Sequence, residues 1–223
     1  MSIKPIQKLN EKRLRLELYI RSQIPEFELK DKRESRLMIF LSKILFFNKD
    51  FMTKYVTTIY PKVYVPELPW KLSNWDEGSS ISAMATLAHE YVHLKDRKRM
   101  GLLFNFLYLF PQNLVFFSLL GVFNPWWYLC LLCALPIPSP TRAWLEYRGY
   151  RMTMFVYEHF GAMRNIDDFV DWIAEHFVNS SYYWMFPAKS YIKNKLKRDI
   201  LLYGSQQKDI SEIREIISVL GGK

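Results

Sequence analysis

Apolar side chains recur at helical spacing over most of the chain, which predicts a mainly α-helical protein. We expect helices over about residues 6–22, 32–47, 81–99, 142–160, 166–178, 187–203 and 209–220. The first helix carries charges of both signs, typical of a solvated face, with a contact to anionic lipid as the alternative. The second has a wide apolar face that suits core packing. Ser79 or Ser80 is expected to cap the helix that begins at Ile81.

A short β-region interrupts the helices between about residues 55 and 70. It is rich in β-branched and aromatic residues, and Val63, Tyr64 and Val65 lie between nearby prolines. Proline beside a short strand favours the edge of a sheet. The expected fold class is therefore mainly α, of the α+β kind, with a small edge-strand element.

From Met100 to Thr141 the chain contains no Asp, Glu, Lys, Arg or His. Two apolar arms, 102–123 and 126–138, are joined by the turn signal Asn124-Pro125. This composition predicts an apolar helical hairpin. The first arm is long enough to span a bilayer, but the second is shorter than the ~20 residues that crossing requires.

Composition limits the possible classes of protein. Hydrophobic residues at 50 % and charged residues at 24 % are globular proportions, and the mean hydropathy of −0.11 excludes a polytopic membrane protein but allows one hairpin. A net charge of +9 favours an acidic partner, such as nucleic acid or an anionic membrane surface. The two cysteines, Cys130 and Cys133, exclude a disulfide framework and are expected to be reduced and buried.

The sequence His89-Glu90-Tyr91-Val92-His93 is an H-E-x-x-H motif on a predicted helix. Residues four apart lie on one helix face, so both imidazoles can reach one metal ion. Zn²⁺ suits two imidazoles and a carboxylate, with the fourth position left for water. Glu90 can take a proton from that water as general base. The alternative is two surface histidines on an amphipathic helix.

A catalytic zinc site needs a third protein ligand. Glu146 is the first acidic residue after the uncharged stretch and lies on a predicted helix among apolar residues. Its alternative role is a salt bridge to Arg142 or Arg148. Glu158 and His159 are weaker candidates for the third ligand.

An H-E-x-x-H motif, a long apolar interruption and a helix bearing Glu146-Tyr147-Arg148-Gly149-Tyr150-Arg151 resemble the integral-membrane zinc metallopeptidases typified by the CAAX prenyl endopeptidases and the bacterial heat-shock membrane protease. The resemblance covers about residues 80–155. It implies a zincin-like core with His89, His93 and Glu146 as ligands of one Zn²⁺. The family's aspartate, four residues after the ligand glutamate, falls on Tyr150, which can donate a hydrogen bond to a ligand or an oxyanion. Arg151 resembles a basic residue that could stabilise the oxyanion.

If the two histidines and Glu146 bind one metal ion, both ends of the apolar stretch lie on the same side of any membrane. Lysines and arginines flank both ends of that stretch, which places the site on the cytoplasmic side. The hairpin then spans the membrane, dips into it or packs as a hydrophobic lobe. Substrate is expected to add as a strand beside Val63, Tyr64 and Val65.

The sequence thus predicts segments 1–50 (charged and amphipathic helices), 51–101 (edge strand and motif helix), 102–140 (apolar hairpin) and 141–223 (third-ligand helix and C-terminal helices), with 51–223 as one catalytic domain. The predicted function is a membrane-associated zinc metalloendopeptidase with protein or peptide substrates. Two alternatives stay open. One is a catalytically silent zinc-binding membrane adaptor. The other, less favoured, is a nucleic-acid-associated protein, motivated by the basic residues Lys189, Lys193, Lys195, Lys197 and Arg198.

Overall fold

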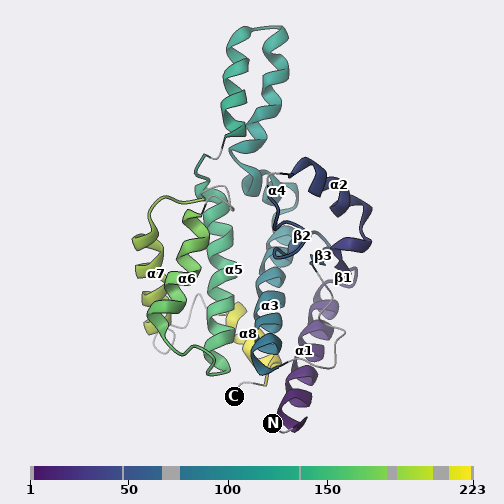
Figure 1. The fold of residues 1–223 in the computed structure, drawn as a ribbon, viewed down its shortest axis with the longest axis vertical. Helices are drawn as coiled ribbons and strands as arrows, with labels where there is room; N and C mark the ends of the chain where they lie inside the picture. Colours follow the sequence, from purple (N-terminus) through teal and green to yellow (C-terminus); the bar gives the residue numbers. More distant parts are fainter. Residues whose placement is uncertain are drawn as a thin grey trace. The chain divides into compact units, whose positions relative to one another are not determined.

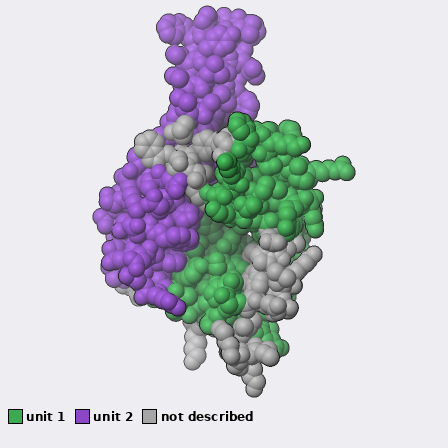
Figure 2. Space-filling view, viewed as in Figure 1, with its two compact units in different colours: residues 1–95, 152–162, 207–223 green, residues 96–151, 163–206 purple. Residues whose placement is uncertain are grey.

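The computed structural model describes residues 3–46, 48–66, 76–135, 137–179, 185–202 and 211–221. It is mainly helical and contains one small sheet, as the sequence predicts. The chain forms two compact units, coloured separately in Figure 2. Unit 1 comprises residues 1–95, 152–162 and 207–223, and unit 2 comprises residues 96–151 and 163–206. The division cuts two helices, α3 (Glu77–Met100) and α5 (Pro140–His159), so each of them contributes to both units.

Unit 1 contains α1 (Ile3–Gln23), the short 3₁₀ helix η1 (Lys32–Glu34), α2 (Arg36–Ile44) and α8 (Ser211–Val219), besides parts of α3 and α5 (Figure 1). One stripe of α1, including Leu16 and Ile20, is fully buried, since residues four apart share a helix face. The expected helix over 32–47 is divided at Ser35. The Ser35 side chain accepts a hydrogen bond from the backbone N–H of Met38 and so begins α2 there.

The sheet of unit 1 has three strands, β1 (Glu28–Asp31), β2 (Thr57–Ile59) and β3 (Lys62–Val65), in the order β1-β3-β2. β3 pairs in parallel with β1 and antiparallel with β2. The prediction that Val63, Tyr64 and Val65 form an edge strand is therefore wrong, because β3 is central and these residues are buried. The partner β1 has the sequence Glu-Leu-Lys-Asp, whose charges conceal a strand from a hydrophobic-pattern search.

Helix α3 begins at Glu77, four residues before the predicted start. The carboxylate of Asp76 accepts a hydrogen bond of 2.7 Å from the backbone N–H of Ser79, and its bonds to Ser79 lower the pKa of Asp76. The expectation that Ser79 or Ser80 caps this helix is wrong, because both lie inside its first turn. The prediction placed the start of the helix too late because Ser79 and Ser80 are polar and the apolar pattern begins only at Ile81.

Unit 2 contains α4 (Leu102–Leu109), the 3₁₀ helices η3 (Gln112–Val122) and η4 (Pro125–Ala134), α6 (Ile166–Val178) and α7 (Lys189–Leu202), besides parts of α3 and α5. The predicted apolar hairpin is present as η3 and η4, which lie side by side in Figure 1. Its first arm is not one helix, since the chain bends by 88° between α4 and η3, where Pro111 cannot continue an α-helix.

Among the described helices, none is by itself both long and apolar enough to cross a bilayer. α4 and η3 together meet the length and composition for a span, but only as a bent pair.

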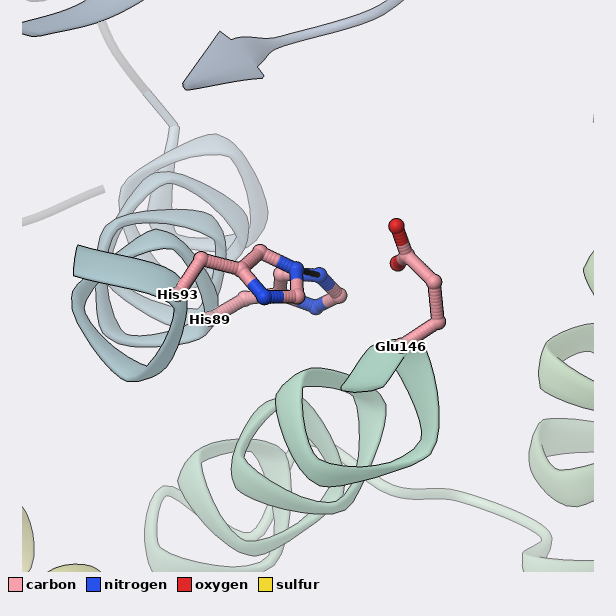
Figure 3. Close-up of side chains that lie close together, drawn as sticks. All are labelled: His89, His93 and Glu146. Atoms are coloured by element: carbon pink, nitrogen blue, oxygen red, sulfur yellow. Dashed lines mark hydrogen bonds between the residues drawn. The ribbon is translucent and has the colours of Figure 1, made fainter. Parts of the chain in front are cut away.

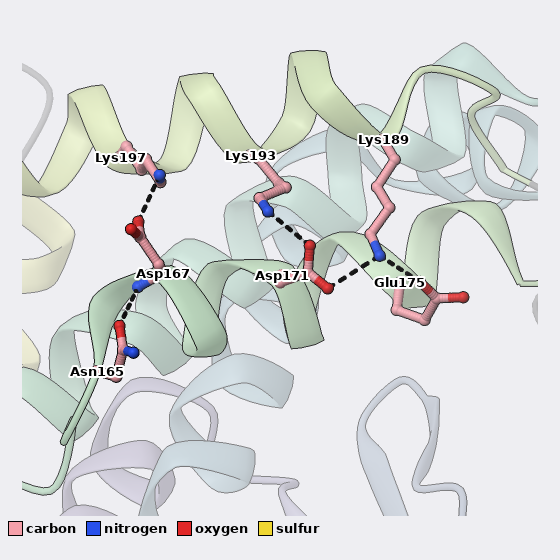
Figure 4. Close-up of polar contacts among 7 residues, drawn as sticks. All are labelled: Asn165, Asp167, Asp171, Glu175, Lys189, Lys193 and Lys197. Atoms are coloured by element: carbon pink, nitrogen blue, oxygen red, sulfur yellow. Dashed lines mark hydrogen bonds and ion pairs between the residues drawn. The ribbon is translucent and has the colours of Figure 1, made fainter.

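Helices α6 and α7 form a second helical pair in unit 2, joined by ion pairs along their outer edge (Figure 4). Lys193 bonds Asp171 at 2.6 Å, and Lys189 bonds both Asp171 (2.9 Å) and Glu175 (2.6 Å). Lys197 pairs with Asp167. Three lysines of the basic C-terminal region thus have carboxylate partners within the fold.

Candidate metal centre

The two histidines of the H-E-x-x-H motif lie one turn apart on α3, as the sequence predicts. Both side chains are buried, and their ring centroids are 4.9 Å apart. The Nε2 atoms of His89 and His93 are separated by 3.1 Å. The alternative of two surface histidines is therefore excluded.

Glu146 projects from α5 toward the same space as the two imidazoles (Figure 3). One ligand atom from each of His89, His93 and Glu146 lies within 4.8 Å of the others, and all three residues are buried. In the part of the chain that the structure describes, these three form the one such group of His, Cys, Asp and Glu. Glu158 and His159, the weaker third-ligand candidates, do not belong to it.

The pairing of α3 with α5 rests on contacts within each compact unit. In unit 1, His89 Nδ1 lies 3.3 Å from Thr153 Oγ1. In unit 2, the guanidinium of Arg148 pairs with the buried carboxylate of Asp96 at 3.1 Å. On α3 these contacts involve His89 and a residue three positions after His93, and on α5 they involve residues two and seven positions after Glu146, so they hold the two helices close to the ligand group.

The spacing of the two imidazole nitrogens suits a tetrahedral metal ion such as zinc. Two Zn–N bonds of about 2.0–2.1 Å at a tetrahedral angle separate the nitrogens by about 3.4 Å, close to the Nε2–Nε2 distance in the structure. The contact of His89 Nδ1 with Thr153 suits the tautomer in which Nδ1 carries the proton and Nε2 is the ligand atom. Two imidazoles and one carboxylate match the donor set of catalytic zinc sites. The group could therefore hold one metal ion.

Three hydroxyl groups hold the polar side chains of the site, and the sequence did not reveal them. Thr153 contacts His89, and Tyr108 of α4 donates a hydrogen bond to Oε1 of Glu146. Thr58 of β2 donates to Oε2 of Glu90 at 2.6 Å. Only Thr153 left a signal, since it stands seven residues after Glu146 and so lies on the same face of α5.

Glu90 is buried beside His89 on α3, and its surroundings contain a buried amine. Lys32 is fully buried, with its Nζ 2.6 Å from the carbonyl oxygen of Phe51 and 3.9 Å from the centre of the Phe51 ring. Burial lowers the pKa of Lys32 to about 8, and the negative charge of Glu90 partly opposes this. Glu90 thus has a hydroxyl donor from β2 and a nearby basic group.

Tyr150 and Arg151, the two further residues that the sequence assigns to the site, make contacts with α6 and α7. The ring of Tyr150 is buried against His176 (5.3 Å) and Phe177 (5.6 Å) of α6. Arg151 pairs with Asp199 of α7 at 3.2 Å. Both residues therefore help to join α5 to α6 and α7, and the α5 residue in contact with His89 is Thr153.

The two arginines that the sequence offers as partners of Glu146 also have contacts with other residues. Arg148 pairs with Asp96, and the Arg142 guanidinium lies 5.1 Å from the centre of the Tyr108 ring. Tyr108 in turn donates to Glu146. The hydroxyl of Tyr108 therefore holds the carboxylate of Glu146, and the guanidinium of Arg142 lies against the Tyr108 ring.

The strand predicted to bind substrate cannot do so by strand addition, because both sides of β3 are paired within the sheet. β2 is an edge strand of the described sheet, and its Thr58 contacts Glu90.

Comparisons with protein-family models, with curated proteins and with solved structures find no match to this chain.

Proposed function

We propose that this protein is a zinc-dependent metalloendopeptidase that works at a membrane surface. The observation that carries the proposal is the convergence of His89, His93 and Glu146 beside Glu90. A zinc ion held by this group would polarise a peptide carbonyl and lower the pKa of water in the site toward ~7.

Glu90 is the general base in this proposal. Its carboxylate takes a proton from the attacking water, whose oxygen bonds to the carbonyl carbon. The same proton then passes to the amide nitrogen as the C–N bond breaks, which releases a carboxylate and an amine. Thr58 fixes one oxygen of Glu90 through the bond at 2.6 Å, so the other oxygen faces the reaction in a defined orientation.

We further propose that an extended peptide binds along the outer edge of β2. This strand lies at the edge of the described sheet, and an edge strand offers backbone donors and acceptors to a peptide. Because Thr58 of β2 contacts Glu90, a peptide on this edge would pass next to the general base.

The hairpin supports the membrane part of the proposal. Ser118 and Gly121, both small, are buried where η3 meets η4, and a side chain at Gly121 would collide with the ring of Tyr128. The large apolar side chains face outward; they include Phe116, Leu119, Val122, Phe123 and Trp126. An exposed apolar surface of this kind marks an interaction site for protein or lipid.

The length of the hairpin favours partial entry into a bilayer. A 3₁₀ helix rises about 2 Å per residue, so η3 extends about 22 Å, short of the ~30 Å hydrocarbon core. We propose that the hairpin dips into the membrane and returns to the same side. Basic residues at both of its ends favour the cytoplasmic side for the metal centre.

The test is Glu90→Gln, with Glu77→Gln at the exposed first turn of the same helix as matched control. Zinc content should be unchanged in both variants. Hydrolysis of a denatured protein substrate should be lost only in Glu90→Gln, because an amide cannot take the proton. Full activity of Glu90→Gln would reject the assigned role.

The second candidate function is a silent zinc-binding membrane adaptor. It is favoured by Tyr150, which packs against α6 and stands where the metallopeptidases that the sequence resembles carry an aspartate. Stoichiometric zinc in the natural chain without hydrolysis of any denatured substrate would select this alternative. The nucleic-acid alternative is weaker, because Lys189, Lys193 and Lys197 have carboxylate partners on α6.

A further inference from the structure

Helix α2 has two apolar faces, and only one of them packs into unit 1. Met38 is fully buried, and Leu41 and Leu45 are partly buried with it against Phe51 and Tyr64. These three helix residues are spaced by three and four, so they form one stripe. This stripe accounts for the core contact that the sequence predicted.

The second apolar stripe of α2 is exposed. Leu37, Phe40 and Ile44 are also spaced by three and four, and they are 45 %, 59 % and 52 % exposed. Phe46 continues the apolar surface beyond the helix. The core packing that the sequence predicts for this helix is therefore present on one stripe, and the other stripe is exposed.

Basic side chains border the exposed stripe. Arg36 and Lys43 are exposed and stand seven residues apart, on one flank of the helix. Lys49 is exposed as well, whereas Arg33 pairs with Asp31 at 3.1 Å, and Glu34 is the one acidic residue between positions 33 and 49. The region thus combines an apolar stripe with an excess of positive charge.

We propose that α2 lies flat on an anionic lipid bilayer, with Leu37, Phe40 and Ile44 at the boundary between acyl chains and headgroups. A helix with one apolar stripe and a basic flank is the pattern of interfacial binding. The long side chains of Arg36 and Lys43 reach lipid phosphates while their stems stay near the apolar region. A second copy of this chain fits less well, because a symmetric contact would bring the same positive charges together. The inference is independent of the metal centre.

A label at position 40 reports this contact separately from the hairpin. In the full chain, Cys130 and Cys133 are replaced by serine, Phe40→Cys is introduced, and the thiol carries an environment-sensitive fluorophore. Vesicles containing phosphatidylserine should shift its emission to the blue, whereas vesicles of phosphatidylcholine alone should shift it less. The control label, at Leu201→Cys on α7, replaces an exposed apolar side chain outside α2 and should not respond. No shift at position 40 overturns the proposal, and so does a shift that follows protein concentration without vesicles.

Charge variants provide a second readout. Each basic residue near an anionic surface contributes about 1 kcal/mol, so Arg36→Gln with Lys43→Gln should weaken binding to phosphatidylserine vesicles at least about tenfold. Lys8→Gln with Arg15→Gln is the matched control, since these exposed residues stand seven apart on α1. Loss of binding in the α1 pair but not in the α2 pair would place the lipid contact on α1 and overturn the proposal.

Discussion

Unit 2 contains two helical pairs that are built in opposite ways. In α6 and α7 the apolar side chains, such as Phe177 and Leu196, are buried and ion pairs lie on the outside. In η3 and η4 the small residues Ser118 and Gly121 lie inside, and side chains such as Phe116 face out. The first pair has the arrangement that water favours, and the second has the arrangement that lipid favours.

The two pairs also connect differently to the ligand-bearing helix α5. The apolar hairpin reaches it through α4, whose Tyr108 donates to Glu146 and whose Leu107 carbonyl accepts a bond of 2.6 Å from Thr141. Helix α7 reaches it through Asp199, which accepts a bond of 2.7 Å from the neighbouring Tyr147. The hairpin side thus touches a proposed ligand directly, whereas the α7 side touches the residue next to it.

The largest expected effect separates the two pairs by stability. Phe177→Ala should lower the free energy of unfolding by about 3–5 kcal/mol, because a fully buried ring leaves a cavity. Phe116→Ala is the matched change on the hairpin. Because this side chain is 70 % exposed, the substitution should change the free energy of unfolding little. Urea unfolding of both variants measures the difference. An equally large cost at Phe116 would mean that protein covers the outer face of the hairpin.

A smaller effect is expected on metal affinity. Tyr108→Phe removes the hydroxyl that holds Glu146 and should weaken zinc binding about 10–100-fold, the usual cost of losing a hydrogen bond to a ligand. Competition titration with a chromophoric chelator gives the dissociation constant.

Tyr147→Phe is the control for that measurement. It removes a buried hydroxyl from the α7 side, where burial and the bond to Asp199 raise the pKa of the tyrosine. This variant should lose stability but keep zinc affinity within a few-fold. If both tyrosine variants weaken zinc equally, Tyr108 has no special part in positioning Glu146.

The smallest effect is expected at the ion pairs between α6 and α7. Lys193 and Lys189 hold the pKa of Asp171 below its usual range, first through hydrogen bonds and then through charge. The stabilisation is therefore present at neutral pH and is lost as the pH falls through the lowered pKa of Asp171. Lys193→Gln should shift the urea midpoint slightly at pH 7 and less in high salt. A salt-independent shift would argue against an electrostatic origin.

What the sequence could predict was mostly local. The spacing of His89 and His93 determines their geometry on any helix, and α6 begins and ends where its apolar periodicity does. Glu146 could be found because it is the first acid after a long uncharged stretch.

The features that the sequence did not predict depend on contacts between residues that are far apart in the chain. β3 became central because the charged segment Glu28–Asp31 pairs with it from more than thirty residues upstream. Thr58 and Tyr108 reach the site from β2 and α4, and nothing in the order of residues marks a single hydroxyl as a partner for a distant carboxylate. For helix α2, the sequence shows a wide apolar face but does not indicate how much of that face packs into the core.

Zinc binding by His89, His93 and Glu146 tests the central claim most directly. Metal analysis of the purified full chain after dialysis against trace zinc should give one zinc per chain, with a large loss in both His93→Ala and Glu146→Ala. Glu158→Ala, which removes an exposed carboxylate from the same helix α5, is the control and should retain the metal. A natural chain without zinc, or a Glu146→Ala variant that binds it as tightly, would contradict the account.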